Sequence, residues 1–300
     1  MHKQIKQIKK CPLCKSIQRE LKFTSIRDGI PSYIYKCKKC DLVYNGIMLQ
    51  NKNSSLLDDK FSEGKKEINE FNRWERLQNH KLFKIEQFIK KSPKKETLRI
   101  LEIGCGPGAL LSAAKKRGWK EYGIEPFVKS YTLAKDKGLN VHNGFLKDKN
   151  YPDNYFDLII SIEVVEHFED QVNEFKEISR VLKEDGLIVI QTANIDGIKF
   201  KIKKSKSPYL YYDHLCYFSP KTLTKILDKF NLNIVKSFPD EINLKNRLIW
   251  CKTFYSKFRW VIFYIIRAIF LNKPILGSMT LYIQHKNILK LNKFEKEELL

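Results

Sequence analysis

A glycine-rich segment at the end of an apolar run constrains the fold of this chain more than any other feature. Residues 98–103 read LRILEI, as expected of a buried strand, and glycines follow at positions 104, 106 and 108. Glycine allows a tight turn off a strand, and it leaves bare main chain at the start of the next helix, where a ligand can lie. The sequence therefore predicts a strand, a ligand-binding loop and a helix, in that order.

Strands and helices alternate along the rest of this region. Besides 98–103, we expect strands at 121–125, 140–143, 156–162 and 187–193, helices near 108–117, 127–137, 170–183 and 219–230, and a further strand pair at 232–238 and 278–285. Such alternation places helices on both faces of a parallel sheet. The predicted fold class is α/β, with a doubly wound, mostly parallel, seven-stranded sheet.

Four of the seven cysteines form the pattern Cys11-x2-Cys14-x22-Cys37-x2-Cys40. Each C-x-x-C turn supplies two thiolates to one side of a tetrahedral ion, and a hairpin between the turns brings the two pairs together. Four thiolates leave no coordination position for water, so zinc held here would have a structural role. The other interpretation is a pair of redox turns, but these usually precede a helix in a βαβ setting, which is absent here.

These patterns divide the chain into three regions. We expect a small zinc ribbon over 1–50, a helical connector over 51–95, and the sheet-forming domain over 96–300, with an apolar, basic insertion at about 246–276. In the connector, apolar residues recur at helical spacing, and the helix is expected to end before Pro93.

The net charge of +22 is distributed unevenly. It is +8 over residues 1–50 and +7 over 246–300, whereas residues 96–195 carry −3. A content of 43% hydrophobic residues excludes a disordered chain. The longest apolar run, 260–266, is far shorter than the ~20 residues that span a bilayer, and the first ten residues lack the apolar core of a signal peptide. We therefore expect a cytoplasmic protein whose basic ends face something negative, a membrane surface in preference to a nucleic acid.

Two acids beside the glycine loop help to identify its ligand. Gly104, Gly106 and Ala109 also satisfy the dinucleotide pattern G-x-G-x-x-G/A, so the loop alone does not exclude an NAD enzyme. Glu102 lies two residues before the first glycine, where an acid can face a cationic ligand. Glu125 ends the second strand, where a carboxylate can accept hydrogen bonds from both ribose hydroxyls.

At these residues the chain resembles the class I S-adenosylmethionine-dependent methyltransferases, whose first motif is E/D-x-G-x-G-x-G. The resemblance continues in the family's order and spacing through four segments: 156–167 (FDLIISIEVVEH), 180–186 (RVLKEDG), 191–194 (QTAN) and 213–219 (DHLCYFS). It covers roughly residues 96–245 and implies a Rossmann-like methyltransferase with S-adenosylmethionine as its cofactor. The cofactor-binding residues that it implies are Glu102, Gly104, Cys105, Gly106, Gly108, Glu125 and Ser161.

The chain departs from the family after the third strand. Many members place an acid there to meet the adenine amine, whereas this sequence has Gly144, Phe145 and Leu146. Either Asp148, further along, or backbone groups would have to make that contact.

A second cluster, E-x-x-E-H, stands where the fourth strand turns into a helix. A helical turn would place Glu163 on the same face as Glu166 and His167. The cluster resembles the divalent-metal site of quinone-ring O-methyltransferases and small-RNA 2′-O-methyltransferases. In the latter a second histidine completes the shell, and His214 could supply it here. Such a set suits magnesium, manganese or zinc. Two alternatives stay open: His167 and His214 act as proton-accepting or substrate-orienting catalytic groups, or the cluster is structural.

The remaining region, 246–276, combines a wide aromatic face with basic residues, which is typical of a segment in a membrane interface or of a packed lid. The first function hypothesis is therefore O-methylation of a saccharide, lipid-linked or quinone-like small acceptor, by an enzyme located at the inner face of a membrane. The alternatives are an RNA 2′-O-methyltransferase, whose ribbon and lysines would bind phosphates, and a non-catalytic zinc-ribbon adaptor that binds nucleic acid or membrane.

Overall fold

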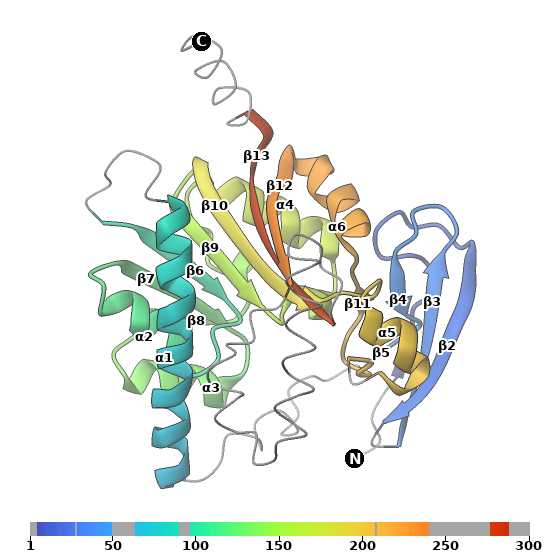
Figure 1. Cartoon of the computed structure of the whole chain (residues 1–300), viewed down its shortest axis with the longest axis horizontal. Coiled ribbons are helices and arrows are strands. Elements are labelled where there is room, and N and C mark those ends of the chain that lie inside the picture. The colour runs from blue at the N-terminus through green and yellow to red at the C-terminus, as the bar shows by residue number, and fades with distance from the viewer. Residues whose placement is uncertain are drawn as a thin grey trace, which may run out of the picture.

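The structure is a computed structural model that describes residues 5–27, 29–49, 64–89, 97–207, 209–239 and 277–287. Its largest element is a twisted sheet with helices on both faces, and a smaller β-rich unit built around the N-terminal cysteines lies at one side of it (Figure 1). The predicted insertion at 246–276 falls outside the described residues.

The large sheet has seven strands in the order β12-β13-β10-β9-β6-β7-β8. Their bounds are β6 Arg99–Ile103, β7 Lys120–Glu125, β8 Val141–Asn143, β9 Phe156–Ile162, β10 Leu182–Ala193, β12 Leu232–Pro239 and β13 Ser278–His285. The strands from β8 to β10 pair in parallel, and β13 pairs antiparallel with both β10 and β12. The predicted fold class, a mostly parallel seven-stranded α/β sheet, is confirmed.

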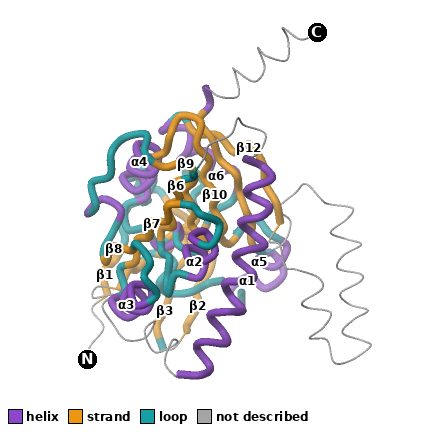
Figure 2. The backbone as a smooth tube through the Cα atoms, turned by 90° about the vertical axis from the view of Figure 1, so that its left-hand side faces the viewer, coloured by secondary structure: helices purple, strands orange, loops and turns teal. Residues whose placement is uncertain are grey.

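Helices cover both faces of this sheet. They are α1 Gly64–Ile89, α2 Ala109–Lys115, α3 Val128–Asp136, α4 Gln171–Val181 and α6 Pro220–Leu227, whereas Phe200 of α5 Ile198–Lys203 belongs to an apolar cluster with Ile34 and Val43 of the N-terminal unit. Leu82 of α1 and Leu110 of α2 belong to the apolar cluster on one face, and Phe175 of α4 and Leu223 of α6 belong to that on the other. Figure 2 shows the sheet strands between α4 and α1.

Local sequence explains where two of these helices begin. The Asp170 carboxylate accepts hydrogen bonds from the backbone N–H groups of Val172 and Asn173 at the start of α4. The Ser219 hydroxyl accepts one from the Thr222 N–H at the start of α6, where Pro220 occupies the first helical position. Both arrangements satisfy N–H groups that have no partner within the helix.

The N-terminal unit is held together by two small sheets. β1 Ile5–Gln7 pairs with β5 Ile47–Leu49, and a four-stranded sheet has the order β11-β4-β3-β2, with β2 Arg19–Arg27, β3 Ile30–Cys37 and β4 Val43–Asn45. Its fourth strand, β11 Cys216–Tyr217, comes from much further along the chain, between α5 and α6. A sheet shared between the predicted ribbon and the predicted 96–300 region was not expected from the sequence, because a two-residue strand leaves no periodic pattern.

Candidate active site

The predicted site residues gather at one edge of the large sheet. β6, β7, β9 and β10 are parallel, so their carboxyl ends meet there, and each is followed by residues that the sequence singles out. Short 3-10 helices, η3 Val165–His167 after β9 and η4 Lys204–Lys206 after α5, lie in the connections that leave this edge.

The glycine loop favours glycine at each of its three positions, for different reasons. Gly104, Gly106 and Gly108 all have left-handed backbone conformations, with φ of 69°, 53° and 81°. A Cβ on Gly104 would lie 2.4 Å from Val164 Cγ2, and one on Gly108 would lie 2.3 Å from Leu139 Cδ1, whereas a Cβ on Gly106 would meet nothing within 4 Å. The loop is therefore packed on both sides of Gly106 and open at Gly106 itself, where a ligand can approach the main chain.

Glu125 and Glu102 flank this loop and differ in their hydrogen bonding. The Glu125 carboxylate accepts hydrogen bonds from the Gly106 N–H (2.7 Å) and the Phe127 N–H (2.9 Å). Glu102 is buried, and its Oε2 has no hydrogen-bond partner among the described residues. Burial raises the pKa of Glu102 well above its usual value, the charge of Lys81 opposes this, and that of Glu125 adds to it. A buried carboxyl with an orphaned oxygen fits a cationic ligand group that these residues do not supply.

The side chains of the other two predicted cofactor residues, Cys105 and Ser161, are both buried. Cys105 belongs to a buried apolar cluster with Leu111 of α2 and Ala134 of α3. Ser161 is buried, and its Oγ has no partner among the described residues. Strand alternation places Ser161 and Glu102 on opposite faces of the sheet, although their strands are neighbours.

Three of the four residues predicted for a divalent site come together. One ligand atom from each of Glu166, His167 and His214 lies within 4.8 Å of the others. The two imidazole rings meet edge to face, with centroids 4.7 Å apart. Burial and the neighbouring His167 lower the pKa of His214 to about 3, so this ring is neutral at neutral pH. Burial raises the pKa of Glu166 well above its usual value, and the negative charge of Glu163 adds to this effect.

Glu163 lies outside this group, against the expectation from the E-x-x-E-H spacing. It adopts φ of 54°, so the backbone turns left-handed and no helix connects it to η3. Its N–H donates to the Gln191 carbonyl at 2.8 Å, which continues the sheet edge. The helical turn expected from 163 to 167 does not form, but the Glu163 carboxylate still lies near that of Glu166, whose pKa it helps to raise, and its role as a metal ligand stays a prediction.

Partners that the sequence did not identify as site residues hold the cluster in place. The Thr192 hydroxyl donates to Glu166 Oε2 at 2.9 Å, and His167 Nδ1 lies 3.0 Å from the Asp213 carbonyl oxygen. The buried Gln171 amide donates to the Val165 carbonyl at 2.8 Å and so fixes η3. Thr192 and Asp213 do lie in segments that resemble the family, but nothing in their spacing indicates these contacts.

Two buried atoms in the cluster are orphaned. Glu166 Oε1 and His214 Nδ1 have no hydrogen-bond partner among the described residues. Both are atom types that ligate divalent cations. The donor set therefore fits a metal ion at this position.

The cluster and the glycine loop are direct neighbours. Val164, whose side chain limits Gly104 to glycine, is next but one to Glu166 in the chain. A molecule beside His167 would therefore also lie close to a ligand bound on the glycine loop.

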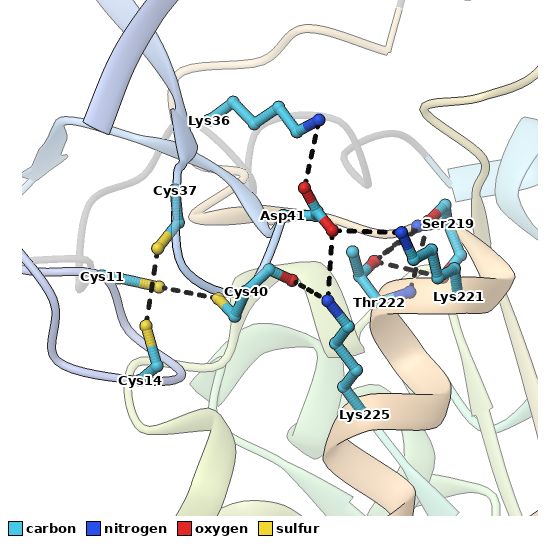
Figure 3. A network of polar contacts seen from close by, with 10 residues as sticks. All are labelled: Cys11, Cys14, Lys36, Cys37, Cys40, Asp41, Ser219, Lys221, Thr222 and Lys225. Carbon is cyan, nitrogen blue, oxygen red and sulfur yellow. Dashed lines mark hydrogen bonds and ion pairs between the residues drawn. The ribbon is translucent and has the colours of Figure 1, made fainter. Parts of the chain in front are cut away.

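The four N-terminal cysteines converge as their spacing predicts. Their Sγ atoms all lie within 4.8 Å of one another, at 3.5 Å between Cys11 and Cys40 and 3.4 Å between Cys14 and Cys37 (Figure 3). These distances exclude disulfides, which need about 2.05 Å. The two turns match: the residue after each second cysteine, Lys15 or Asp41, is left-handed and donates its N–H to the carbonyl of the first cysteine at 3.0 Å. The arrangement fits a tetrahedral ion.

Comparison with known proteins agrees with this geometry. Residues 73–237 match the family model described as a methyltransferase domain. A ubiquinone biosynthesis O-methyltransferase from Bradyrhizobium sp. (strain ORS 278) is 28% identical over 145 residues, which are 43% of this chain and 56% of the relative. An ajmaline N-methyltransferase from Rauvolfia serpentina is 34% identical over 107 residues, 33% of this chain and 37% of the relative. The chain thus spans about half the length, or less, of these curated relatives.

A solved structure of a SAM-dependent methyltransferase from Archaeoglobus fulgidus shares the fold. It superposes with a TM-score of 0.51 at 20% identity and covers 76% of this chain and 97% of its own. The family match extends over more than half of the chain and includes the glycine loop, Glu125 and the Glu166 cluster. This chain belongs to the class I S-adenosylmethionine-dependent methyltransferases.

Proposed function

We propose that this protein transfers the methyl group of S-adenosylmethionine to a hydroxyl oxygen of a small acceptor, with a phenol of a quinone-like ring as the first candidate. The observation that carries the proposal is the Glu166–His167–His214 cluster directly beside the glycine loop. The name of the Bradyrhizobium relative, a ubiquinone biosynthesis O-methyltransferase, supports the choice of acceptor class.

The residues around the loop would hold and orient the cofactor. Its sulfonium supplies an activated methyl group, so the protein has to align donor and acceptor and remove one proton. Glu102, buried with an orphaned oxygen, suits the cationic end of the cofactor, and Glu125 suits the ribose hydroxyls after exchanging its backbone partners. The Asp148 carboxylate accepts a hydrogen bond from the Phe145 N–H at 2.8 Å, and we assign it no contact with adenine.

We also propose that Glu166, His167 and His214 hold a divalent cation, magnesium or manganese. The two orphaned buried atoms of Glu166 and His214 support this assignment. A bound cation would lower the pKa of an acceptor hydroxyl. The rival role is proton transfer by His167 itself: if its Nδ1–H donates to the Asp213 carbonyl, the basic lone pair is on Nε2.

Metal binding can be measured without an acceptor. Titration of the full chain with Mn²⁺, followed by electron paramagnetic resonance, should show one site that Glu166→Gln weakens at least tenfold. Glu169→Gln, three residues further along, is the matched control and should leave the affinity unchanged. Turnover that ignores a chelator but disappears in His167→Gln would instead support the proton-transfer role.

The acceptor is best identified by label transfer. The full chain with methyl-labelled cofactor is offered a catechol, a saccharide, a polyprenyl-linked acceptor and RNA in parallel. We expect label on the catechol or the lipid-linked acceptor, lost in His167→Gln and retained in His80→Gln. Label on RNA alone would replace the proposal by the nucleic-acid alternative, and no label on any acceptor despite cofactor binding would favour the adaptor hypothesis.

For the four cysteines we propose one structural Zn²⁺. Their convergence and the matched turns support it. Elemental analysis of the purified chain should give one zinc per molecule, and Cys37→Ser should remove it. A metal-free chain with an unchanged fold would contradict this assignment.

We further propose contact with an anionic membrane surface. In the part of the chain that the structure describes, no helix is long and apolar enough to cross a membrane. Residues 201–206, at the end of α5 and in η4, are all exposed and include four lysines and Ile202, which is 74% exposed. η4 lies beside β2, whose Ile26 is 75% exposed. Basic residues near such a surface contribute about 1 kcal/mol each.

Vesicle sedimentation tests this surface. The full chain should pellet with vesicles containing phosphatidylserine and remain in solution with phosphatidylcholine alone. The double variant Lys203→Glu, Lys204→Glu should reduce pelleting, whereas Lys135→Glu on α3 should not. Equal pelleting of all three proteins would refute this surface.

A further inference from the structure

The segment that carries Asp213 and His214 is attached to the cysteine-bearing unit by strand pairing. β11 begins two residues after His214 and pairs antiparallel with β4, with Cys216 opposite Tyr44 and Tyr217 opposite Val43. β4 begins three residues after Cys40 in the chain. A single short strand therefore lies between the cysteine cluster and the segment that ends in His214.

The backbone of one residue, Leu215, connects this unit to the candidate site. The Leu215 N–H donates to the Glu166 carbonyl at 2.8 Å, and the Leu215 carbonyl accepts from the Asn45 N–H at 3.0 Å. Leu215 thus bridges the last residue of β4 and the residue that precedes His167.

The Asn45 side chain makes a second bridge. It is fully buried, and its Nδ2 donates to the Tyr212 carbonyl at 3.2 Å and lies 3.4 Å from Ser32 Oγ. Its Oδ1 accepts from the Ile47 N–H at 3.3 Å. Both the Nδ2 and the Oδ1 of this buried amide are hydrogen-bonded. The amide therefore fixes the segment just before Asp213, because a shift of that segment would leave a buried polar atom unpaired.

Arg27, at the end of β2, holds the same segment from further upstream. Its Nη2 donates to the Ser207 carbonyl at 2.8 Å, and its guanidinium lies 4.4 Å from the centroid of the Tyr211 ring. The Tyr211 ring in turn lies 5.4 Å from that of His214, and the Tyr217 hydroxyl donates to the Tyr211 carbonyl at 3.0 Å.

The cysteine-bearing unit is itself fixed to the helix that follows β11. Asp41 pairs with Lys221 and Lys225 of α6, each at 3.1 Å, and Lys225 also donates to the Cys40 carbonyl at 2.8 Å (Figure 3). The second cysteine turn therefore contacts the chain on the far side of His214 as well.

From these contacts we infer that the cysteine-bearing ribbon is a supporting wall of the active site, and that Asn45 is a positioning residue which holds His214 against His167 and Glu166. The inference rests on the proposed function for its effect on turnover. The mechanical coupling between Asn45 and the 209–217 segment does not depend on it.

Hydrogen exchange in the full chain tests the coupling without an acceptor. Asn45→Ala should raise the exchange of amides in 209–217, the Leu215 amide above all, by about tenfold or more, while α2 and β6 keep their protection. Ser32→Ala, which removes the other contact of the Asn45 amide and leaves Tyr212, should keep the segment protected. Arg27→Gln is a second variant that loosens the segment from the other side, should Asn45→Ala fail to fold.

Two further measurements separate positioning from general damage. S-adenosylmethionine affinity by calorimetry should stay within about twofold of the wild type, and kcat should fall by about tenfold to a hundredfold with the cofactor KM unchanged. Unchanged exchange in 209–217, or full turnover despite increased exchange, would overturn the inference. If exchange responds as expected but the wild type methylates no acceptor, the proposed function fails and the coupling stands.

Discussion

At the scale of single residues, a substitution of Gly106 allows the effect on cofactor binding to be distinguished from the effect on folding stability. Gly106 has φ of 53° and open space where a Cβ would stand, so Gly106→Ala adds left-handed strain of about 1–2 kcal/mol and places a methyl group where the cofactor approaches. Gly118→Ala is the matched control, because Gly118 has φ of 76° and equally open space outside the loop. Calorimetry should show cofactor affinity lost in the first variant and kept in the second, with similar losses of stability in both. Equal affinities would contradict the assignment of the loop.

Glu102 should lower the stability of the ligand-free protein at neutral pH and strengthen cofactor binding. Burial raises its pKa, so in the ligand-free protein the ionised form is disfavoured relative to the unfolded chain. The carboxyl therefore contributes most below its unfolded pKa of about 4.3, and that contribution is lost as the pH rises towards its folded pKa. Glu102→Gln should make the ligand-free protein more stable at pH 8 than the wild type, by a margin that shrinks towards pH 4, and should weaken cofactor binding. A urea titration at both pH values measures the margin, and a variant less stable at pH 8 would refute this.

The sequence predicted residue identities better than residue orientations. The glycines, Glu102, Glu125 and the neighbours Glu166 and His167 stand out by motif spacing, whereas the pairing with His214 was expected only from the family resemblance. Cys105 follows the left-handed Gly104 and belongs to a buried apolar cluster, and the left-handed Glu163 is not joined to η3 by a helix; motif spacing determines neither conformation.

At the scale of elements, the strands and helices of the large sheet lie where periodicity and turn residues predicted them. Two features depart from the prediction: α4 ends at Val181, and β10 begins at once at Leu182, with an irregular register before Leu187. α5 and β11 were not predicted, because six-residue and two-residue elements are too short to leave a period. The division into three regions stays a prediction.

The ion pairs between Asp41 and the lysines of α6 should stabilise the fold in a pH-dependent way. Hydrogen bonds from Lys225, Lys221 and Lys36 hold the pKa of Asp41 well below its usual value. A depressed folded pKa means that its contribution is complete above the unfolded pKa of about 3.9 and is lost as the pH falls through the folded pKa. Because a third of the side chain is exposed, we expect Asp41→Asn to cost only about 0.5–1 kcal/mol at pH 7.

Urea unfolding measures this effect, and the difference between Asp41→Asn and the wild type should shrink below pH 4 and in high salt. Glu20→Gln, which removes an exposed pair with Lys22 on β2, serves as the control and should cost less. A difference that persists unchanged at pH 2 would mean that Asp41 acts through packing and not through its charge.

At the scale of the whole molecule, the cysteine-bearing unit and the large sheet share one apolar core. Cys37 and Leu42 belong to the same buried cluster as Phe175 of α4 and Leu223 of α6. The sequence could not show this, because the contacts join segments about 180 residues apart, as Arg27 and Ser207 are.

Removal of the metal from the four cysteines should therefore also loosen segments outside the ribbon. A mercurial reagent with a chelator should release the zinc, raise hydrogen exchange in β3, β4 and 209–217 together, and leave α2 and cofactor affinity within about twofold of the untreated protein. Exchange confined to the ribbon would show that its fold is independent of the active site.

The central claim is that the glycine loop and its flanking acids bind S-adenosylmethionine. Calorimetric titration of the full chain with S-adenosylmethionine tests it most directly. We predict one site with a Kd between about 1 μM and 1 mM, the range of ordinary enzyme–substrate affinities, and no detectable binding in Gly106→Ala. Absence of heat from the wild-type chain at millimolar cofactor, or equal binding by Gly106→Ala, would contradict it.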